Sequence, residues 1–347
     1  MMHDEVVTRR GWLDDQRFLD LIGVTNLIPG PNSTEMAMHV GHERAGWRGL
    51  ITAGASFILP AALIVLAFAW AYVEYGTTPG GEALLYGIKP VVLMIVVQAL
   101  IRLGRSAIKE WFTGLIGASA TAAYLLGFSE LAILAIGGMA VLALQSTRTV
   151  PLATLLPLLG GQAVTTTSMD SVSLGRLFGV FLKAGAFLFG SGYVLLAFLH
   201  NDLVRGLEVL TEQQLLDAIA IGQFTPGPVF TTATFIGYLL GGWTGAIVAT
   251  VGIFLPSFLF VAAISRLSRQ VRKRSWTSAL LDGVNAAALG LMAGVTFQLG
   301  VDALADPLSL VIGITASLLL WRTRINTAWL IAGGGLAGLL ATLVSSS

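Results

Sequence analysis

The chain has 347 residues with a formal net charge of +1, and 55% of its residues are hydrophobic whereas only 11% are charged. Soluble domains carry roughly 25% charged residues, so this composition indicates an integral membrane protein and argues against a soluble domain with one anchor. The balanced charge gives no indication of a nucleic-acid partner, and the absence of cysteine excludes disulfides, thiolate metal sites and cysteine nucleophiles.

Apolar windows of about 20 residues, long enough to cross a bilayer, recur along the chain. The N-terminal segment MMHDEVVTRRGWLDDQRF is charged where a cleavable signal would be apolar, so no signal peptide is predicted. Nine membrane spans are expected, near residues 49–73, 83–101, 111–127, 130–146, 177–199, 244–265, 279–299, 307–321 and 326–344.

Two further helical stretches, 12–46 and 211–241, are each interrupted by the sequence Pro-Gly-Pro, at 29–31 and at 226–228. Proline removes a backbone donor and glycine admits dihedral angles that other residues avoid, so each stretch should break there. Each arm is too short to cross the bilayer alone. We therefore predict two broken re-entrant hairpins whose tips lie near the middle of the membrane.

The chain also repeats itself. The two Pro-Gly-Pro sequences lie 197 positions apart, as do Asp20 and Asp217, and after a slip of one residue Pro60 matches Pro256 at an offset of 196. A register held over more than 130 residues indicates two homologous halves. We assign a first repeat to residues 1–146, a linker with the polar middle TTTSMDS to 147–174, and a second repeat to 175–347.

Basic residues fall in alternate loops of the two halves. The segment RLGRSAIKE of the first half carries Arg102, Arg105 and Lys109, whereas its partner QLGVDALADP has no Lys or Arg. The opposite holds for SRLSRQVRKRSW of the second half and its partner YVEYGTTPGGE. Because basic loops stay in the cytoplasm, the halves are predicted to have inverted topology. Inversion needs an odd number of crossings per half, so we expect the first repeat to lack its first helix, the counterpart of 177–199.

The two tips carry the predicted substrate site. Inverted repeats whose broken helices meet near mid-membrane are typical of secondary transporters. Backbone N–H groups after each second proline, on 32–34 and 229–231, point at the tip and are expected to bind an oxyanion, together with nearby hydroxyl and amide side chains. A packed kink without a ligand is the alternative. The predicted substrate-binding residues at the tips are Asn26, Pro29, Gly30, Pro31, Asn32, Ser33 and Thr34 in one half and Gln223, Thr225, Pro226, Gly227, Pro228, Thr231 and Thr232 in the other.

Ionisable residues inside spans cost roughly 2.5–3.5 kcal/mol each on insertion scales and are functional candidates. Lys89 and Lys183 are therefore added to the substrate-binding set, because each could neutralise a dianion; snorkelling to the interface is the alternative. Glu35 and His39 share one helix face and could relay a proton for coupling, or Glu35 could neutralise a lysine. Asp20 and Asp217, which recur in the two halves, are expected to pair with basic groups or to cap structure rather than to bind an anion.

The segments LIPGPNSTEMAMHVGHERAGWRG, YGIKPVV, FLKAGAFLFGSGYVLL and QFTPGPVFTTATFIGYLLGGWTGA resemble the chromate ion transporter family in its long, two-domain form. The resemblance covers essentially the whole chain. It implies efflux of chromate across the bacterial inner membrane, which confers chromate resistance, with sulfate as a related oxyanion. The family's first domain begins with a helix that carries a Phe-Gly-Gly-Pro motif; its second-half counterpart here is Phe189 to Gly192, and the first copy is absent.

We therefore expect an all-α, multi-pass protein of the bacterial inner membrane that exports chromate by alternating access. Its partners would be chromate, sulfate and the lipid bilayer, and a homodimer is compatible with the sequence. An exporter or exchanger of sulfate or another small anion is the alternative. An intramembrane enzyme is a minor alternative, because the sequence has no catalytic serine constellation and its four histidines form no HExxH metal motif, so neither a metal nor a cofactor is expected.

Overall fold

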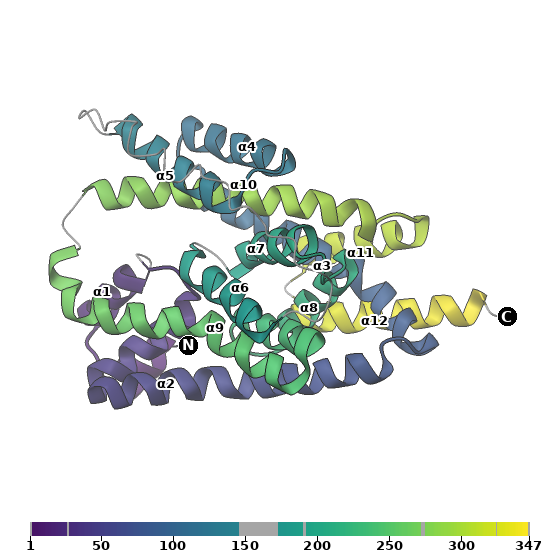
Figure 1. The fold of residues 1–347 in the computed structure, drawn as a ribbon, viewed down its shortest axis with the longest axis horizontal. Helices are drawn as coiled ribbons and strands as arrows, with labels where there is room; N and C mark the ends of the chain where they lie inside the picture. The colour runs from purple at the N-terminus through teal and green to yellow at the C-terminus, as the bar shows by residue number, and fades with distance from the viewer. Residues whose placement is uncertain are drawn as a thin grey trace.

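The computed structural model describes residues 2–25, 28–145, 173–189, 192–271, 275–323 and 325–345. In these ranges all regular structure is helical, without any strand, and the long helices lie roughly along the longest axis of the molecule (Figure 1). The chain is thus an all-α membrane protein. Among the described residues, four segments are long and apolar enough to cross a membrane: Asn32–Tyr75, Pro79–Ala107, Val229–Ile264 and Ser278–Ala303.

The described helices follow one another in a similar order in the two halves. The first half contains the π-helix η1 (Asp4–Arg9) and the α-helices α1 (Asp15–Thr25), α2 (Asn32–Tyr75), α3 (Pro79–Ala107), α4 (Trp111–Leu125) and α5 (Glu130–Gln145). The second half contains α6 (Leu174–Phe187), η3 (Gly192–Val194), α7 (Leu195–Leu199), η4 (His200–Gly206), α8 (Glu212–Phe224), η5 (Val229–Thr231), α9 (Thr232–Val271), α10 (Ser275–Ala303), α11 (Pro307–Arg322) and α12 (Thr327–Ser345).

The breaks predicted at Pro-Gly-Pro are confirmed, because α1 and α8 end before these sequences and the next helices begin after them. The expected separation of 31–46 from 49–73 is confirmed, although the single label α2 covers both ranges. A kink at the non-helical residues Ala45 and Gly46 divides α2 into two arms, and Gly46 has φ 55° and ψ −139°. The two arms fold back on each other, because a Cβ on Gly41 would overlap the Gly49 carbonyl. Helix α9 has the same kink at Gly241 and Gly242, with φ 58° and ψ −147° at Gly242. A positive φ of this kind favours glycine, which explains both kinks.

The span expected over 177–199 is wrong as one continuous helix. Helix α6 ends at Phe187, and the next described helix begins at Gly192. Leu188, directly after α6, has extended backbone dihedral angles, φ −84° and ψ 102°. The other short spans fold as helices of 15 to 19 residues, α4, α5, α11 and α12. The predicted linker 147–174 lies outside the described residues except for its last two.

Each half packs against the other through equivalent helices. The second arms of α2 and α9, which follow the kinks, lie against each other and run in opposite directions, that of α2 to the right and that of α9 to the left in Figure 1. Helix α3 packs against α11 and α12, and helix α10 packs in the same way against α4 and α5. These contacts are close because glycines meet: a Cβ on Gly87 would overlap the Gly334 carbonyl, and one on Gly283 would overlap the Gly137 carbonyl.

Candidate functional site

The first tip joins α1 to α2 and is held from outside its own hairpin. Gly30 has φ +136°, a conformation that favours glycine, and both Pro29 and Gly30 are buried. The Gly30 N–H donates a hydrogen bond to the Leu188 carbonyl oxygen at 2.9 Å, just after the end of α6. The break after α6 therefore supplies an acceptor to the tip. Asn26, a predicted site residue, lies outside the described residues.

The second tip joins α8 to η5 and has the same backbone form. Gly227 has φ +153°, but Pro226 and Gly227 are exposed. A Cβ on Gly227 would overlap the Ala61 side chain, which lies in the middle of α2. In the first hairpin, a Cβ on Gly30 would approach the Ser257 hydroxyl oxygen at 2.7 Å, in the middle of α9. Each tip therefore meets the long helix of the other half.

The amide donors predicted at the two tips need a correction. The Thr34 N–H donates to the Pro31 carbonyl oxygen at 2.8 Å, and the Thr231 N–H donates to the Pro228 carbonyl oxygen at 3.0 Å. These two amides belong to the first turn of their helices, so they do not point at the tip as predicted. Amide binding of an anion is therefore limited to the first two residues after each second proline.

Most of the predicted hydroxyl donors bond to their own helix. The hydroxyls of Thr225, Thr231 and Thr232 donate to the carbonyl oxygens of Ile221, Pro228 and Val229, at 2.8 to 2.9 Å. A hydroxyl proton used in this way is not offered to an anion. The Thr34 side chain differs: it is fully buried, and its hydroxyl has no hydrogen-bond partner in the described part of the chain. Ser33 and Asn32 lie exposed at the first tip.

Gln223 is the best-placed amide side chain at the second tip. Its Oε1 accepts a hydrogen bond from the Tyr193 hydroxyl at 2.9 Å. Its Nε2 is buried and has no partner among the described residues. Since the oxygen is fixed by Tyr193, the two N–H donors are left for a ligand. Gln223 is the penultimate residue of α8, which ends at Phe224 before the Thr225-Pro226-Gly227 turn.

Lys89 belongs to a polar group in which α2, α3 and α8 meet. The buried carboxylate of Asp217 accepts a hydrogen bond from the Tyr72 hydroxyl at 2.9 Å, and Lys89 lies within its electrostatic reach. The expected pairing with a basic group is not met by an ion pair among the described residues. Lys89 is half-buried, and one oxygen of Asp217 has no hydrogen-bond partner in the described structure. The lysine charge is thus near, but not hydrogen-bonded to, a carboxylate.

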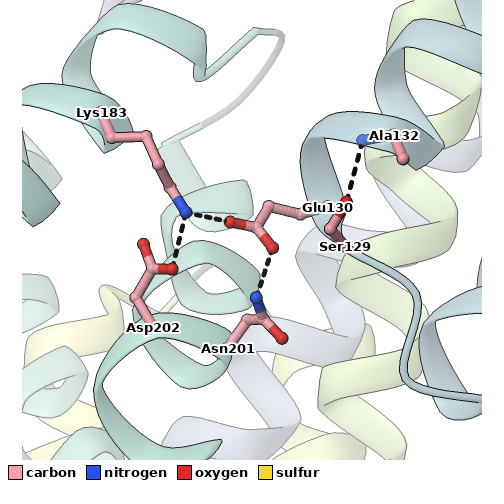
Figure 2. A network of polar contacts seen from close by, with 6 residues as sticks. All are labelled: Ser129, Glu130, Ala132, Lys183, Asn201 and Asp202. Atoms are coloured by element: carbon pink, nitrogen blue, oxygen red, sulfur yellow. Dashed lines mark hydrogen bonds and ion pairs between the residues drawn. The ribbon is translucent and has the colours of Figure 1, made fainter. Parts of the chain in front are cut away.

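Lys183 has two acid partners (Figure 2). Its ammonium group, which projects from α6, forms ion pairs with Glu130 at the start of α5 and, at 2.6 Å, with Asp202 in η4. The Asn201 side chain donates a further hydrogen bond to the other oxygen of Glu130 at 2.5 Å. Two carboxylates balance one ammonium here, so the lysine charge is already satisfied. This network holds α6 against α5 and η4, and we leave Lys183 out of the anion site proposed below.

Glu35 and His39 lie together on the buried side of α2. Glu35 is 0% exposed, and its Oε1 accepts a hydrogen bond from the Ser257 hydroxyl at 3.3 Å. Its Oε2 and the His39 Nε2 are buried without partners in the described residues. The carboxylate closes over the first tip, because a Cβ on Gly30 would overlap it. An ionisable group at this depth is a functional candidate.

One group of polar residues was missed by the sequence analysis. Gln98, Arg102 and Arg105 line a cleft of about 410 Å³ between α3 and the junction of α11 and α12. Tyr193, the residue that holds Gln223, is part of the same lining. The spacing i, i+4, i+7 places the three α3 residues on one helix face, so this signal was present in the sequence. The arginines were interpreted only as markers of the cytoplasmic side.

The polar groups near the two tips include hydrogen-bond donors and one cation. The described residues contain no group of three or more His, Asp or Glu that could hold a metal ion. They do bring together turns with positive φ, an amide donor at Gln223 and a lysine near the second hairpin. Amide donors and a cation are groups that can bind a small oxyanion.

Comparison with known proteins gives a consistent result. A model of the chromate transporter family matches residues 1–144 and 175–339. The chromate transport protein of Cupriavidus metallidurans is 31% identical over 98% of this chain and 87% of its own length. The chromate transport protein of Pseudomonas aeruginosa is 31% identical over 98% of this chain and 86% of its own length. The probable chromate transport protein of Synechococcus elongatus is 32% identical over 92% of this chain and 84% of its own length. No solved structure matches the chain significantly.

Proposed function

The chain belongs to the chromate transporter family, and we propose that it is a secondary transporter that exports chromate across the bacterial inner membrane by alternating access. The observation that carries this proposal is the reciprocal placement of the two glycine tips. Each tip meets the long helix of the other half, Gly30 near Ser257 and Gly227 against Ala61. Two half-sites contributed in this way form a pocket whose walls can move with either half.

Inverted repeats are part of the proposal, and four observations support them. The kinked helices α2 and α9 run in opposite directions and share the same kink dihedrals (Figure 1). Helices α3 and α10 pack against equivalent partners. The family match falls on two separate stretches of similar length. The end of α9, the start of α10 and the kink of α2 lie at one end of the molecule, as basic segments on one membrane side require.

The depth of the tips supports their interpretation as re-entrant hairpins. Ala61 and Ser257 each lie 15 residues after the kink glycines Gly46 and Gly242, which is the middle of the arms that end at Tyr75 and Val271. An arm of about 30 residues is about 45 Å long and spans a bilayer. Helices α1 and α8, with 11 and 13 residues, are about 16 and 20 Å long and cannot cross alone. Tips that meet mid-arm therefore lie at mid-membrane depth.

The proposed substrate site combines polar groups from both hairpins. The N–H groups of Gln223 and the backbone after Pro228 supply donors at the second tip, and Lys89 supplies positive charge near α8. Asn32 and Ser33 contribute from the first tip. Chromate is a tetrahedral dianion, which such donors and one cation can bind without a metal. Sulfate has the same shape and charge, so it is the competing substrate to test.

Export fits the energetics of a dianion. Leaving a cell that is negative inside releases about 4.6 kcal/mol at roughly 100 mV, enough for an outward gradient of order 10³. The membrane potential alone can thus drive transport. Glu35 and His39 form a buried pair beside the first tip, and in this proposal they tune the rate rather than supply the driving force.

Everted membrane vesicles that contain the protein provide the test, because export then appears as chromate uptake. Collapse of the membrane potential with valinomycin and potassium should abolish uptake, whereas collapse of the pH gradient with nigericin should leave it. The opposite pattern would contradict potential-driven export. Glu35→Gln keeps the shape and the bond to Ser257, so it should retain potential-driven uptake. Labelled sulfate in the same vesicles measures substrate preference.

A further inference from the structure

The basic cleft on α3 lies outside the two tips and is built like a small-molecule site. Its volume of about 410 Å³ falls within the 300–1,000 Å³ of typical ligand pockets. Its polar and aromatic lining is contributed by α3, by the junction of α11 and α12 and by η3: Gln98, Arg102, Arg105, Tyr193, Trp321 and Thr327.

The cleft carries positive charge that no protein group balances. Neither Arg102 nor Arg105 forms an ion pair in the part of the chain that the structure describes, and no carboxylate is among the lining residues. Nearby Lys109 differs, because it pairs with Asp282 at 2.7 Å. Basic residues in the last turn of a helix also offset its dipole, but this role does not require them to line a cleft. Two guanidinium groups on one wall match the geometry of a tetrahedral oxyanion.

The cleft is connected to the second tip by one residue. Tyr193 lines the cleft, lies within electrostatic range of Arg102, and donates its hydroxyl hydrogen bond to Gln223. The neighbouring Gly192 also touches η5, since a Cβ on it would lie 3.3 Å from the Val229 Cβ. A ligand held by the arginines is therefore separated from the second tip by the Tyr193 side chain.

The equivalent place in the other half is filled. The residues 196 positions after Gln98 and Arg102 are Gly294 and Gln298, and neither carries a charge. Tyr124 packs there: it is 0% exposed, a Cβ on Gly294 would approach its ring at 2.6 Å, and its hydroxyl is 2.7 Å from His200 Nδ1. The packing of α10 against α4 and α5 therefore leaves no equivalent cleft beside Gly294. Of the two equivalent helices α3 and α10, α3 is the one whose described residues line an open, basic cleft.

We propose that the α3 cleft is an entry site at which a tetrahedral oxyanion dianion binds before it reaches the second tip. This inference rests on the proposed transport function, and it adds a site that precedes the central one. The phosphate of an anionic lipid headgroup shares the same chemistry, so the test must separate a free oxyanion from a lipid.

Trp321 provides a built-in reporter of occupancy. Chromate absorbs where tryptophan emits, so chromate bound in the cleft should quench Trp321. The protein is placed in nanodiscs of phosphatidylcholine, and the difference between wild type and Trp321→Phe isolates this signal from the other tryptophans. We expect saturable quenching that sulfate relieves. Absence of any Trp321-dependent quenching by chromate would overturn the proposal.

Variants then assign the signal to the arginines. The double variant Arg102→Gln with Arg105→Gln should raise the chromate concentration for half-maximal quenching about tenfold or more. This increase should be smaller at high salt, because salt screens the arginine charges in the wild type. The double variant Arg102→Lys with Arg105→Lys should have a half-maximal chromate concentration between those of the wild type and the glutamine pair, because lysine keeps the charge but loses the bidentate geometry. Arg48→Gln removes one exposed charge elsewhere and should bind as wild type, and thermal melting checks that each variant is folded. Unchanged quenching in the glutamine pair would overturn the proposal.

A lipid arm and a flux arm complete the test. If nanodiscs with phosphatidylglycerol lose the Trp321 signal that phosphatidylcholine nanodiscs show at the same chromate and salt concentrations, the headgroup is the ligand and the entry site is overturned. In vesicles, the glutamine pair should need about tenfold more chromate for half-maximal uptake, with the maximal rate kept. If the glutamine pair took up chromate at the wild-type rate at low chromate concentration, the role of the cleft as an entry site would be overturned, but binding of chromate in the cleft would not. A wild type without any chromate uptake would instead contradict the proposed function and leave the binding result standing.

Discussion

The two Pro-Gly-Pro turns share a sequence and a backbone form, yet one is buried and the other is exposed. Pro29 and Gly30 are buried, whereas Pro226 and Gly227 are exposed. The difference begins four residues after the second proline, at Glu35 in the first hairpin and at Thr232 in the second. The Glu35 carboxylate reaches back over Gly30 to the Ser257 hydroxyl. Thr232 is too short to do so and donates to the Val229 carbonyl instead.

The comparison separates what sets the shape of a turn from what sets its accessibility. Proline and glycine fix the backbone of both tips, because they restrict and extend the allowed dihedral angles in the same way. One side chain on the following helix then closes one tip or leaves the other open. The open tip keeps the amide of Gln223 for a ligand, and the closed tip buries a carboxylate that would repel a dianion when charged. Duplication has thus produced two unlike half-sites.

Alanine substitutions at the tip glycines Gly30 and Gly227 should give the largest effects, and they test the backbone geometry described for the two tips. Left-handed backbone costs alanine about 1–2 kcal/mol, and overlap adds about 1–3 kcal/mol. Gly30→Ala meets both Glu35 and Ser257, so it should lose most folded protein and all transport. Gly227→Ala meets only Ala61, so Gly227→Ala with Ala61→Gly should recover part of the melting temperature. Thermal melting in detergent measures the stability of each variant. If Gly30→Ala and Gly227→Ala both melted at the wild-type temperature, the described tip geometry would be contradicted.

Loss of the Lys183 charge should destabilise the first tip more than the second. Lys183→Met leaves Glu130 and Asp202 facing each other without a cation, and α6, which carries the acceptor at Leu188, loses its anchor. Breaking a buried pair costs about 3–5 kcal/mol, and the partial exposure of Lys183 lowers this to roughly 2 kcal/mol. Melting should therefore fall by several degrees. Lys183→Met with Glu130→Gln removes one charge of each sign and should recover stability; failure to recover would mean that the network is not an ion-pair anchor.

A change at Gln223 sharpens the comparison at the open tip. Gln223→Leu removes the unpartnered N–H donors, and also the acceptor of the Tyr193 hydroxyl, while it keeps the volume of the side chain. A hydrogen bond to a charged group contributes about 1.5–3 kcal/mol, so chromate affinity should fall about tenfold or more, and loss of the Tyr193 bond should lower melting by a few degrees at most. Thr225→Val is the matched control, because the Thr225 hydroxyl already donates to its own helix. Equal losses of chromate affinity in Gln223→Leu and Thr225→Val would show that the Gln223 N–H groups do not bind the anion.

Local features of the sequence predicted much of the fold. Proline and glycine act on the backbone where they stand, so the breaks at both tips were predictable, as were the ends of α4, α5, α11 and α12 to within two residues. The breaks at Gly46 and Gly242 were likewise predicted, as the ends of 12–46 and 211–241. The ends of α3 lie four and six residues beyond the predicted span 83–101. The end of α6 was missed because the apolar run 177–199 is long enough to be expected as one span.

The site was less predictable because its chemistry depends on contacts between distant segments. Lys183 looked like a free cation, and its partners Glu130 and Asp202 come from other helices. The reach of Glu35 to Ser257 likewise joins the two halves and leaves no local pattern. Arg102 and Arg105 could have been found from their spacing with Gln98 on one helix face. Their connection to Gln223 through Tyr193 could not, since η3 follows a break that the sequence did not reveal.

The smallest expected effect compares the caps of two equivalent helices, Glu110 before α4 and Asp306 before α11. The Tyr86 hydroxyl donates to Asp306 at 2.5 Å and is the main reason why the pKa of Asp306 lies below its usual value of 3.8. A carboxyl whose pKa is lowered by folding stabilises the protein above its unfolded pKa, and this stability is lost as pH falls through the folded value. Tyr86→Phe should therefore lower the melting temperature by on the order of 1 °C at pH 7, because Asp306 is only partly buried, and the difference should shrink as pH falls below 3.8 and vanish once Asp306 is protonated. A difference that persists unchanged at low pH would mean that Tyr86 acts through packing against α11 and not through the Asp306 charge.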